Sequence, residues 1–427
     1  MAPNGSRCPN KSHPGAARLG AQSLRMRPHL FPGLLSLALI AGCQSPAPAA
    51  PTAEPAMPLR VATFNTSLYD ETHGGLVARL DEGDEDARAI AATLQEVRAD
   101  VVLLNEFDYD AEGRAADLFQ SHYLDVPQDG GRPIRYPFRY LAEVNTGVPS
   151  GLDLDGDGRV GGEGRFHGND AWGYGLHPGQ YGMLVLSMHP IDAAAVRSFR
   201  LLRWSAMPGA LQPVLPDTGK PFYPVEVWRQ LRLSSKSHWD LPIDTPLGRI
   251  HLLAAHPTPP VFDGPERRNA RRNHDEIRLW AEYISPGDKP WLCDDAGRCG
   301  GLPGTERFVI VGDYNADPAD GGSLPGTIQQ LLEHPRVLRF ATPRSEGAIA
   351  SAEATGGGNL GQKSSPAHDT ASFGPRNGNY RVDYVLPSVG LPVQASGVFW
   401  PREGERGFAW LQATDHRVVW VDLAAPE

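Results

Sequence analysis

Cysteine is scarce in this chain, and so are apolar runs long enough to cross a membrane. Only 4 of the 427 residues are cysteine, and no histidine lies near the closely spaced pair Cys293 and Cys299. A metal site at this pair is the less favoured interpretation, because two thiolates are too few to hold a metal. In an exported protein, the pair would instead close the small loop between them as a disulfide. After residue 43, no stretch is apolar enough for a membrane span.

An excess of positive charge is also missing. The chain has 40 Lys and Arg against 50 Asp and Glu, which gives a formal net charge of -10. Residues 1–42 hold five basic residues and no acidic one, so the remainder carries -15. Strong nonspecific attraction to nucleic acid or anionic lipid is not expected from this balance. A phosphate-ester substrate is still compatible with it, because a bound divalent cation or a local basic groove can recruit phosphate.

The first 43 residues have the pattern of an export signal. Arg25 and Arg27 precede the apolar run 30–40, and the following Ala-Gly-Cys43 is typical of the cleavage site of a bacterial lipoprotein. The apolar run is too short for a comfortable membrane span. We therefore predict a lipoprotein signal peptide over residues 1–42, lipidation of Cys43, and a protein anchored to the outer membrane or cell surface, or secreted. A plain secretory signal or a transmembrane anchor is the alternative.

A single folded domain is expected after a short linker. Residues 43–58 are rich in proline and alanine and are predicted to form an extended tether. The whole chain is 41% hydrophobic and 21% charged, and its 47 glycines and 40 prolines indicate many turns between short strands. No internal repeat or second domain boundary is visible. We predict one monomeric domain over residues 59–427, with a glycine-rich insertion at residues 145–182.

The stretch ERFVIVGDYNADP, which begins at Glu306, changes character abruptly. Residues 308–311 are an apolar run typical of a buried strand. Asp313, Asn315 and Asp317 then follow at alternate positions, where a rigid sheet can hold polar side chains in place. Asp and Asn are also ordinary turn formers, so this motif alone fits a simple turn equally well.

Polar side chains also lie at the ends of other predicted strands. Apolar runs predict strands at 59–64, 101–104, 181–187, 248–256, 381–386 and 418–423. Beside these runs, or within their first or last residues, lie Asn65, Glu106, His256, Asp383, Asp415 and His416. Each alone would fit a turn or a solvated group, but together they suit metal-assisted hydrolysis of a phosphate ester. Carboxylates hold Mg²⁺, an aspartate activates water, and histidines stabilise or protonate phosphate oxygens.

The remaining pattern is mixed. Helical spacing of apolar residues predicts helices at 87–97, 266–284 and 327–332, and further strands are predicted at 225–235 and 237–243. The polar segment 342–379 is predicted to be a long loop. Together with the many short strands, these elements predict a β-rich α+β fold.

A possible calcium-binding loop lies in the glycine-rich insertion. Asp153, Asp155 and Asp157 alternate with Leu and Gly in the pattern of such a loop. Gly164 stands where an EF-hand has its closing glutamate, Glu163 lies one position early, and the flanks are not helical. We predict a structural Ca²⁺ site here, with an ordinary Asp/Gly turn as the alternative.

Several of these motifs resemble those of the endonuclease/exonuclease/phosphatase superfamily. The specific ones are GDYNADP at 312–318, RVDYVLPS at 381–388 and TDHRVV at 414–419, and FNT at 64–66, NEFD at 105–108 and AAHPTPP at 254–260 fall in the right order. The resemblance covers most of residues 59–423. It implies a four-layer α/β/β/α sandwich with two packed, mainly antiparallel β-sheets.

The resemblance also implies roles for single residues. Glu106 would bind Mg²⁺ or Mn²⁺, with Asn65 beside it and Asp415 assisting. Asp313 would align or activate the attacking water, and Asn315 would contact the phosphate.

Two histidines complete the implied site. Asp383 would pair with His416 and favour its imidazolium form, which faces a phosphate oxygen. His256 would act as a general acid or as a second contact to the transition state. No carboxylate partner for His256 is evident in the sequence.

Departures from the known branches leave the substrate open. In inositol phosphatases a Tyr-Arg pair follows the motif that ends at Asn315, and this pair is missing here. No run of basic residues indicates a protein that binds DNA tightly. An aromatic hairpin like that of sphingomyelinases is not evident, although Phe222, Tyr223 and Trp228 could form one. We predict an exported, nuclease-like phosphodiesterase that uses activated water, with nucleic acid as one candidate substrate. The alternatives are a non-catalytic, calcium-stabilised surface binding protein and a sphingomyelinase-like lipid phosphodiesterase.

Overall fold

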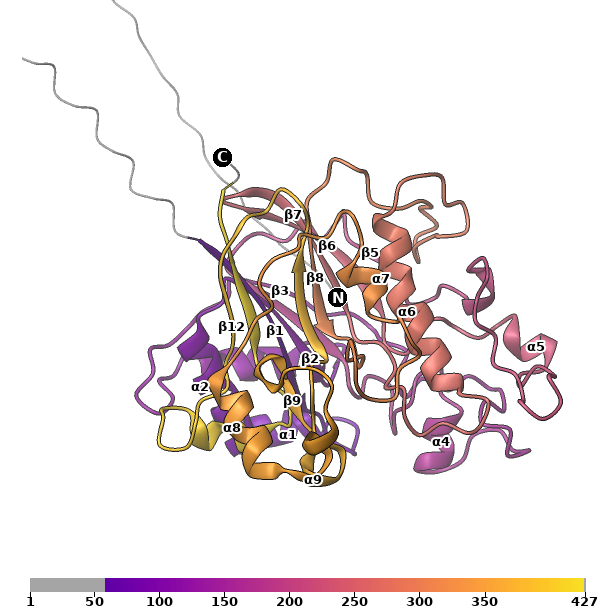
Figure 1. Cartoon of the computed structure of the whole chain (residues 1–427), viewed down its shortest axis with the longest axis horizontal. Coiled ribbons are helices and arrows are strands. Elements are labelled where there is room, and N and C mark those ends of the chain that lie inside the picture. The colour runs from indigo at the N-terminus through magenta and orange to yellow at the C-terminus, as the bar shows by residue number, and fades with distance from the viewer. Residues whose placement is uncertain (1–57, 426–427) are drawn as a thin grey trace, which may run out of the picture. The chain divides into compact units, whose positions relative to one another are not determined.

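The computed structural model describes residues 58–425 of the chain (Figure 1). The predicted signal peptide, the lipidation site Cys43 and all but the last residue of the predicted tether lie outside the described residues. Within the described range, no helix combines the length and the apolar character that a membrane span requires.

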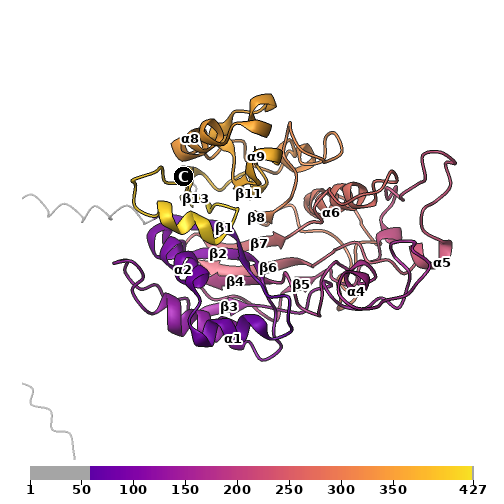
Figure 2. The ribbon, with the colours of Figure 1, turned by 90° about the horizontal axis from the view of Figure 1, so that it is seen from below.

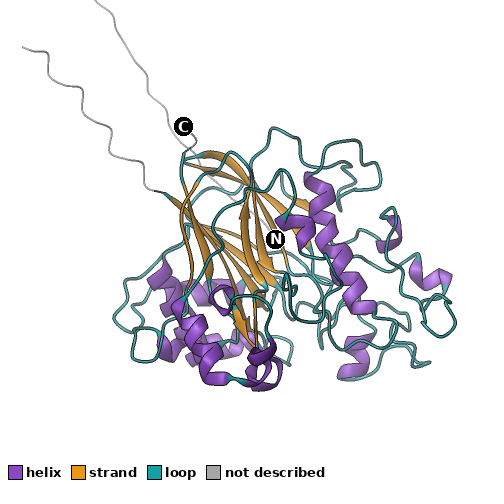
Figure 3. Cartoon of the chain, viewed as in Figure 1, coloured by secondary structure: helices purple, strands orange, loops and turns teal. Residues whose placement is uncertain are grey.

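Two β-sheets lie at the centre of the domain (Figure 3). Over residues 58–425, the larger sheet has the order β12 (Val393–Val398), β13 (Val419–Leu423), β1 (Leu59–Leu68), β2 (Val101–Phe107), β4 (Met183–Ser187) and β3 (Phe138–Tyr140). The smaller has the order β11 (Asp383–Pro387), β8 (Phe308–Asp313), β7 (Gly248–Ala255), β6 (His238–Thr245) and β5 (Arg197–Ser198). Only β1 with β2 and β7 with β8 are parallel pairs among these strands, so both sheets are mainly antiparallel.

Helices cover the outer face of each sheet. The larger sheet is covered by α1 (Gly75–Glu82), α2 (Glu85–Val97) and α3 (Arg114–Leu118), and the smaller by α6 (Arg268–Ile284) and α7 (Gln329–Leu332). Figure 2 shows α1 and α2 on one side of the strands and α6 on the other. Shorter helices lie in the connections: α4 (Arg165–Asn169), α5 (Val225–Trp228), α8 (Glu346–Thr355) and α9 (Gly374–Asn377).

Alternation of side chains along the strands produces four layers. In β8, Val309 and Val311 pack into the core between the two sheets, whereas Phe308 and Ile310 pack against Trp280 of α6 and its neighbours. This period of two is the consequence of the pleat of a strand. The predicted α/β/β/α sandwich is therefore confirmed.

Helix α2 begins in an acidic segment, two residues before the predicted helix at 87–97. The carboxylate of Asp84 accepts a hydrogen bond from the backbone N–H of Ala87 at 2.7 Å and caps the helix. Glu85 and Asp86 lie in the first turn, where negative charge favours the helix. The acidic patch thus has a structural role.

The predicted strand over 225–235 is wrong. Its first residues form α5, and Val227 and Leu231, one helical turn apart, are buried in the core beneath α6. Tyr223 is 6% exposed and stacks on Trp228 with ring centroids 6.5 Å apart, so these aromatic residues form no exposed hairpin. Apolar residues that alternate over a short segment fit a strand and an irregular buried connection equally well.

The predicted loop over 342–379 is also wrong, because most of it is folded. Helix α8 begins after Ser345, whose hydroxyl accepts the N–H of Gly347 at 3.0 Å. The segment continues through short helical turns, β9 (Ala371–Ser372), α9 and β10 (Asn379–Tyr380). Alanine in 346–355 supports a helix even though the segment is nearly devoid of large apolar residues.

Cys293 and Cys299 are joined by a disulfide, as the sequence predicted. The loop that they close lies against β5, where the carboxylate of Asp294 is 2.9 Å from Nε of Arg197. The disulfide therefore closes a loop that an ion pair holds to the edge of the smaller sheet.

His238, the first residue of β6, is buried as a neutral imidazole. Its Nε2 donates to the backbone oxygen of Glu276 at 2.9 Å, and its Nδ1 accepts from the hydroxyl of Ser234. Burial lowers the pKa of His238 to about 3. Both ring nitrogens are used in the neutral form, so protonation would break one of these hydrogen bonds.

This burial predicts a loss of stability in mild acid. The pKa of His238 is depressed in the folded state, so its contribution is present above its unfolded pKa of about 6.5 and is lost as the pH falls toward 3. Between pH 7 and pH 5, the free energy of unfolding should fall by about 2 kcal/mol from this group. Urea unfolding of the unmodified protein and of His238→Gln at both pH values measures the difference. Equal pH dependence in the two proteins would contradict the prediction.

Candidate active site

The carboxylate of Asp313 lies at the centre of a buried polar cluster. Asp313 ends β8 and is 1% exposed. Around its Oδ2 atom lie Asn65 Nδ2 at 3.1 Å, His256 Nε2 at 3.5 Å and His416 Nε2 at 3.6 Å. Three side chains far apart in the sequence therefore converge on one oxygen atom.

Strand direction explains this convergence. β7 and β8 are parallel, so His256 and Asp313 follow or end their strands at the same edge of the smaller sheet. Asn65 and Glu106 lie in the parallel pair β1 and β2 of the larger sheet in the same way. Strands that run antiparallel to these bring their first residues to this edge, and Asp383, which opens β11, lies opposite Asp313.

A buried amide joins the two sheets at this edge. Oδ1 of Asn105 in β2 accepts the backbone N–H of Asp313 at 3.2 Å, and its Nδ2 donates to the backbone oxygen of Ala255 at 3.5 Å. Asn105 is fully buried and therefore fixes where β2 lies relative to β7 and β8. No role was predicted for Asn105, although it is the first residue of the motif NEFD at 105–108.

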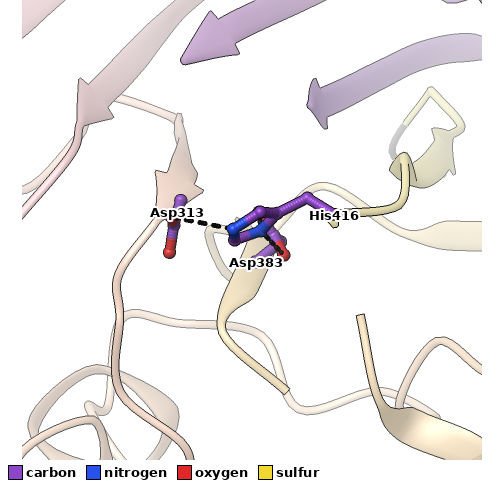
Figure 4. Close-up of side chains that lie close together, drawn as sticks. All are labelled: Asp313, Asp383 and His416. Carbon is purple, nitrogen blue, oxygen red and sulfur yellow. Dashed lines mark hydrogen bonds and ion pairs between the residues drawn. The ribbon is translucent and has the colours of Figure 1, made fainter. Parts of the chain in front are cut away.

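His416 forms an ion pair with Asp383 (Figure 4). Its Nδ1 donates to Oδ2 of Asp383 at 2.9 Å, while Nε2 is turned toward Asp313. Burial lowers the pKa of His416, but the charges of Asp383 and Asp313 outweigh it and raise this pKa to about 10. His416 is therefore an imidazolium at neutral pH, oriented by Asp383.

Thr370 orients Asp383 in turn. Its hydroxyl donates to Oδ2 of Asp383 at 2.7 Å and accepts the backbone N–H groups of Val382 and Asp383, each at 3.0 Å. The ring of Phe373 packs edge-on against His416, with centroids 5.6 Å apart. Sequence reasoning missed Thr370, since it lies in the segment that was predicted to be a loop.

Burial also raises the pKa of Asp313, to about 7, and the charge of His416 opposes this rise. Asp313 accepts the backbone N–H of Asn315 at 2.9 Å, and Nδ2 of Asn315 donates to the backbone oxygen of Pro257 at 3.2 Å. Asn315 has a φ of 51°, in the left-handed region that asparagine tolerates better than most residues. These contacts connect the loop after β8 to the loop after β7.

Asp317, an ordinary turn former with no predicted part in the chemistry, closes the far side of this loop. Its Oδ1 accepts the N–H groups of Ala319 and Asp320, each at 2.8 Å. Its Oδ2 accepts the N–H of Arg381 at 2.8 Å. Asp317 therefore ties the turn after β8 to the start of β11.

His256 is buried beside two carboxylates. Besides Asp313, Oε1 of Glu106 lies 3.9 Å from its Nε2, and neither ring nitrogen forms a hydrogen bond to a described residue. Burial, with Lys236 and His416, holds the pKa of His256 well below its usual range. His256 is therefore neutral and can offer an N–H group but no positive charge.

Glu106 lies at the more open side of the cluster. It is the last residue but one of β2, with a φ of 56°, and its side chain is 23% exposed. Burial raises its pKa, and the charges of His416 and Lys236 and a hydrogen bond from Asn65 oppose the rise. Asp415 is more exposed, at 49%, and its Oδ1 lies 3.8 Å from Nε2 of His416.

The chemistry of these side chains suits a divalent cation. Glu106, Asn65 and Asp415 offer hard oxygen ligands of the kind that Mg²⁺ or Mn²⁺ takes. Asp313, Asp383 and His416 also bring ligand atoms within 4.8 Å of one another. In this second group, however, Nδ1 of His416 already donates a hydrogen bond to Asp383. We therefore interpret His416 and Asp383 as a pair that holds a proton and not as metal ligands.

Lys236 is a member of the cluster that the sequence analysis missed. It lies just before β6 and is 6% exposed. Burial lowers its pKa, while the carboxylates of Glu276, Glu106 and Asp313 raise it. No motif surrounds Lys236 in the chain, so only its electrostatic interaction with Glu106 and Asp313 in the folded protein identifies it.

The structure thus brings together all eight residues predicted for the catalytic and metal sites: Asn65, Glu106, His256, Asp313, Asn315, Asp383, Asp415 and His416.

The predicted calcium loop is a separate cluster with a different third member. Carboxylate oxygens of Asp153, Asp155 and Asp170 lie within 4.8 Å of one another. Asp157 instead accepts the backbone N–H of Arg159 at 2.8 Å. The third carboxylate, that of Asp170, lies outside the loop motif and therefore cannot be recognised from the motif.

The protein is a mainly antiparallel α/β/β/α sandwich with acids and two histidines at one edge of both sheets. This architecture is that of a class of proteins that in general hydrolyse phosphate esters with a divalent metal. The chain belongs to the endonuclease/exonuclease/phosphatase family, whose model matches residues 62–416. No curated protein matches the chain.

Solved structures with a similar fold come from different organisms. An endonuclease/exonuclease/phosphatase from Beutenbergia cavernae is 19% identical, with a TM-score of 0.47 over 87% of this chain and 72% of the other. Sphingomyelinase C from Streptomyces griseocarneus is 18% identical, with a TM-score of 0.41 over 86% and 99%. The human Nocturnin catalytic domain with a bound sulfate is 12% identical, with a TM-score of 0.41 over 86% and 94%.

The charge state of His416 can be measured directly. In Asp383→Asn, the pKa of His416 should move down toward its ordinary value, because Asp383 is the strongest of the carboxylates that raise it. Imidazole NMR titration of the metal-free protein measures this pKa. Asp244→Asn, which removes an exposed partner of Arg249, is the matched control and should leave the titration unchanged. An unchanged His416 in Asp383→Asn would contradict the assigned ion pair.

Proposed function

We propose that this chain is a divalent-metal-dependent phosphodiesterase of nuclease-like type that activates water for attack on phosphorus. The observation that carries the proposal is the arrangement around Asp313. Its Oδ2 lies 3.5 Å from His256 and 3.6 Å from His416, and His416 is held by Asp383. A carboxylate that can take a proton thus lies beside an imidazolium that can stabilise a phosphate oxygen.

The charge of the site favours a diester. His416 brings positive charge to the neighbourhood of Asp313 and Glu106, and Lys236 interacts with the same two carboxylates, while His256 is neutral. A diester carries one negative charge and a monoester up to two, so this modest positive charge suits the diester better. A bound divalent cation, held by Glu106 with Asn65 and Asp415, would neutralise further charge on the phosphate oxygens.

The residues then divide the hydrolysis among them. Asp313 accepts a proton from water as the water oxygen bonds to phosphorus; its pKa of about 7 suits this exchange near neutral pH. His416 donates a hydrogen bond to a phosphate oxygen, and Asn315 holds the nucleophile. As the bond from phosphorus to the leaving oxygen breaks, the N–H of the neutral His256 donates a hydrogen bond to that oxygen. The leaving oxygen takes its proton from solvent, and Asp313 returns the proton of the attacking water to solvent.

The test is a panel of phosphate esters with the purified protein. We expect turnover of plasmid DNA or bis-nitrophenyl phosphate with Mg²⁺ or Mn²⁺, less turnover of nitrophenyl phosphate, and loss of turnover with a chelator. His416→Ala should lower kcat by roughly 100-fold or more, since the loss of one donor that stabilises charge on the transition state costs about that much. The exposed His122→Ala is the matched control and should keep full activity.

Three results would point elsewhere. Turnover that survives the chelator or His416→Ala would contradict the mechanism. Preference for sphingomyelin vesicles would favour a lipid phosphodiesterase. No turnover on any ester, with the fold intact, would favour a non-catalytic surface binding protein.

We infer in addition that the glycine-rich insertion takes a structural Ca²⁺ ion. The carboxylates of Asp153, Asp155 and Asp170 provide three hard oxygen ligands within 4.8 Å. Asp170 also accepts the N–H groups of Leu154 and Gly161, each at 2.7 Å, and so closes the loop.

Calcium should therefore raise the melting temperature. We expect a rise in the unmodified protein, measured by differential scanning calorimetry, and a much smaller one in Asp155→Asn. The exposed Asp217→Asn serves as control and should respond like the unmodified protein. An identical melting curve with and without Ca²⁺ would argue against the site.

Export and lipid anchoring are part of the same proposal. They rest on residues 1–43, which the structure does not describe, and they remain predictions from the sequence.

A further inference from the structure

Helix α6 directs two fully buried polar side chains toward the backbone of the active-site loops. Asn273 and Glu276 are one turn apart and are each 0% exposed. Neither has a part in the hydrolysis described above. A buried carboxylate is costly unless its oxygens find donors, so its partners indicate what it does.

Glu276 holds two loops at once. Its Oε1 accepts the backbone N–H of Ser235 at 2.6 Å, and its Oε2 accepts the backbone N–H of Thr258 at 2.6 Å. Ser235 directly precedes Lys236, and Thr258 follows His256 by two residues. The two oxygens of one carboxylate therefore join the loop that carries Lys236 to the loop that carries His256.

These N–H groups need such a partner. β6 begins at His238 and β7 ends at Ala255, so Ser235 and Thr258 lie beyond the paired part of the sheet. A buried N–H without an acceptor loses free energy comparable to a lost hydrogen bond. A carboxylate offers two acceptor oxygens, whereas a glutamine of the same size offers one, so the residue type matches the task.

Asn273 adds the third loop. Its Nδ2 donates to the backbone oxygens of Thr258 at 2.8 Å and of Tyr314 at 2.9 Å. Tyr314 lies between Asp313 and Asn315. One face of α6 thus binds the loops of Lys236, His256 and Asp313 from behind the site.

We propose that Glu276 is a positioning residue, whose carboxylate sets the separation between Lys236 and His256 that hydrolysis requires. This inference rests on the proposed function. Glu276 does not reach the substrate; it acts through the two backbone segments. The charge of Glu276 also raises the pKa of Lys236, as the charges of Glu106 and Asp313 do.

The test compares three variants on α6. Glu276→Gln keeps the size of the side chain but replaces one acceptor by an NH₂ group, and Glu276→Asp keeps both acceptors and the charge but withdraws them by one methylene. The matched control is Glu282→Gln, on the same helix, where Glu282 pairs with Arg278 at 3.1 Å and Lys289 at 3.4 Å away from the site. Activity on bis-nitrophenyl phosphate is measured with Mg²⁺ below the melting temperature of each variant.

We expect kcat to fall about tenfold or more in both Glu276 variants, with a smaller change in KM, and to stay unchanged in Glu282→Gln; a factor of ten corresponds to ~1.4 kcal/mol. Amide hydrogen exchange at Ser235 or Thr258 should accelerate in Glu276→Gln. In a Lys236→Met background, the effect of Glu276→Gln should shrink, because residues that act together are not additive.

Different results separate the two hypotheses. If the unmodified protein hydrolyses diesters and the Glu276 variants lose only melting temperature, with kcat intact, the inference is overturned and the proposed function stands. Full additivity with Lys236→Met would also overturn it. If the unmodified protein hydrolyses no ester, the proposed function fails and this inference fails with it.

Discussion

The burial of one carboxylate, that of Asp313, is the constraint on which the site depends. An ionised carboxylate in a protein interior needs hydrogen-bond donors or positive charge nearby. Asp313 obtains them from Asn65 at 3.1 Å and from His256 and His416 at 3.5 and 3.6 Å. Because these side chains belong to different strands of two sheets, the sheets must pack in one relative position, and the buried amide of Asn105 links them there.

A second set of contacts holds the residues that surround Asp313. Thr370 fixes Asp383, which in turn fixes the ring of His416. Glu276 holds the loops of Lys236 and His256 from the opposite side. The segment 342–379 and helix α6 are therefore the two supports of the site. Each contributes buried polar groups that have few alternative hydrogen-bond partners. These groups therefore hold the site in a defined geometry.

Much of the site was predictable, because its residues follow apolar runs that are easy to recognise. Asp313 follows Phe308–Val311, Glu106 follows 101–104, and His256 follows 248–255. Parallel strands end at a common edge, so the residues after them meet. Lys236, Thr370 and Glu276 had no such signal. Lys236 and Thr370 lie in irregular backbone, where no apolar run precedes them. Glu276 is one of several acids on α6, and the spacing of apolar residues does not distinguish a buried acid from an exposed one.

The amino-acid sequence by itself determined most strands of the two sheets, the helices α2, α6 and α7, the family motifs and the identity of the groups available for chemistry, because these depend on local periodicity and composition. Only the tertiary structure decided their charge states and their partners. The imidazolium of His416, the raised pKa of Asp313 and the neutral His256 arise chiefly from burial and from neighbours that lie far away along the chain, such as Asp383 for His416. Electrostatic interaction depends on distance in space and on exclusion of water, and neither is a local property of the sequence.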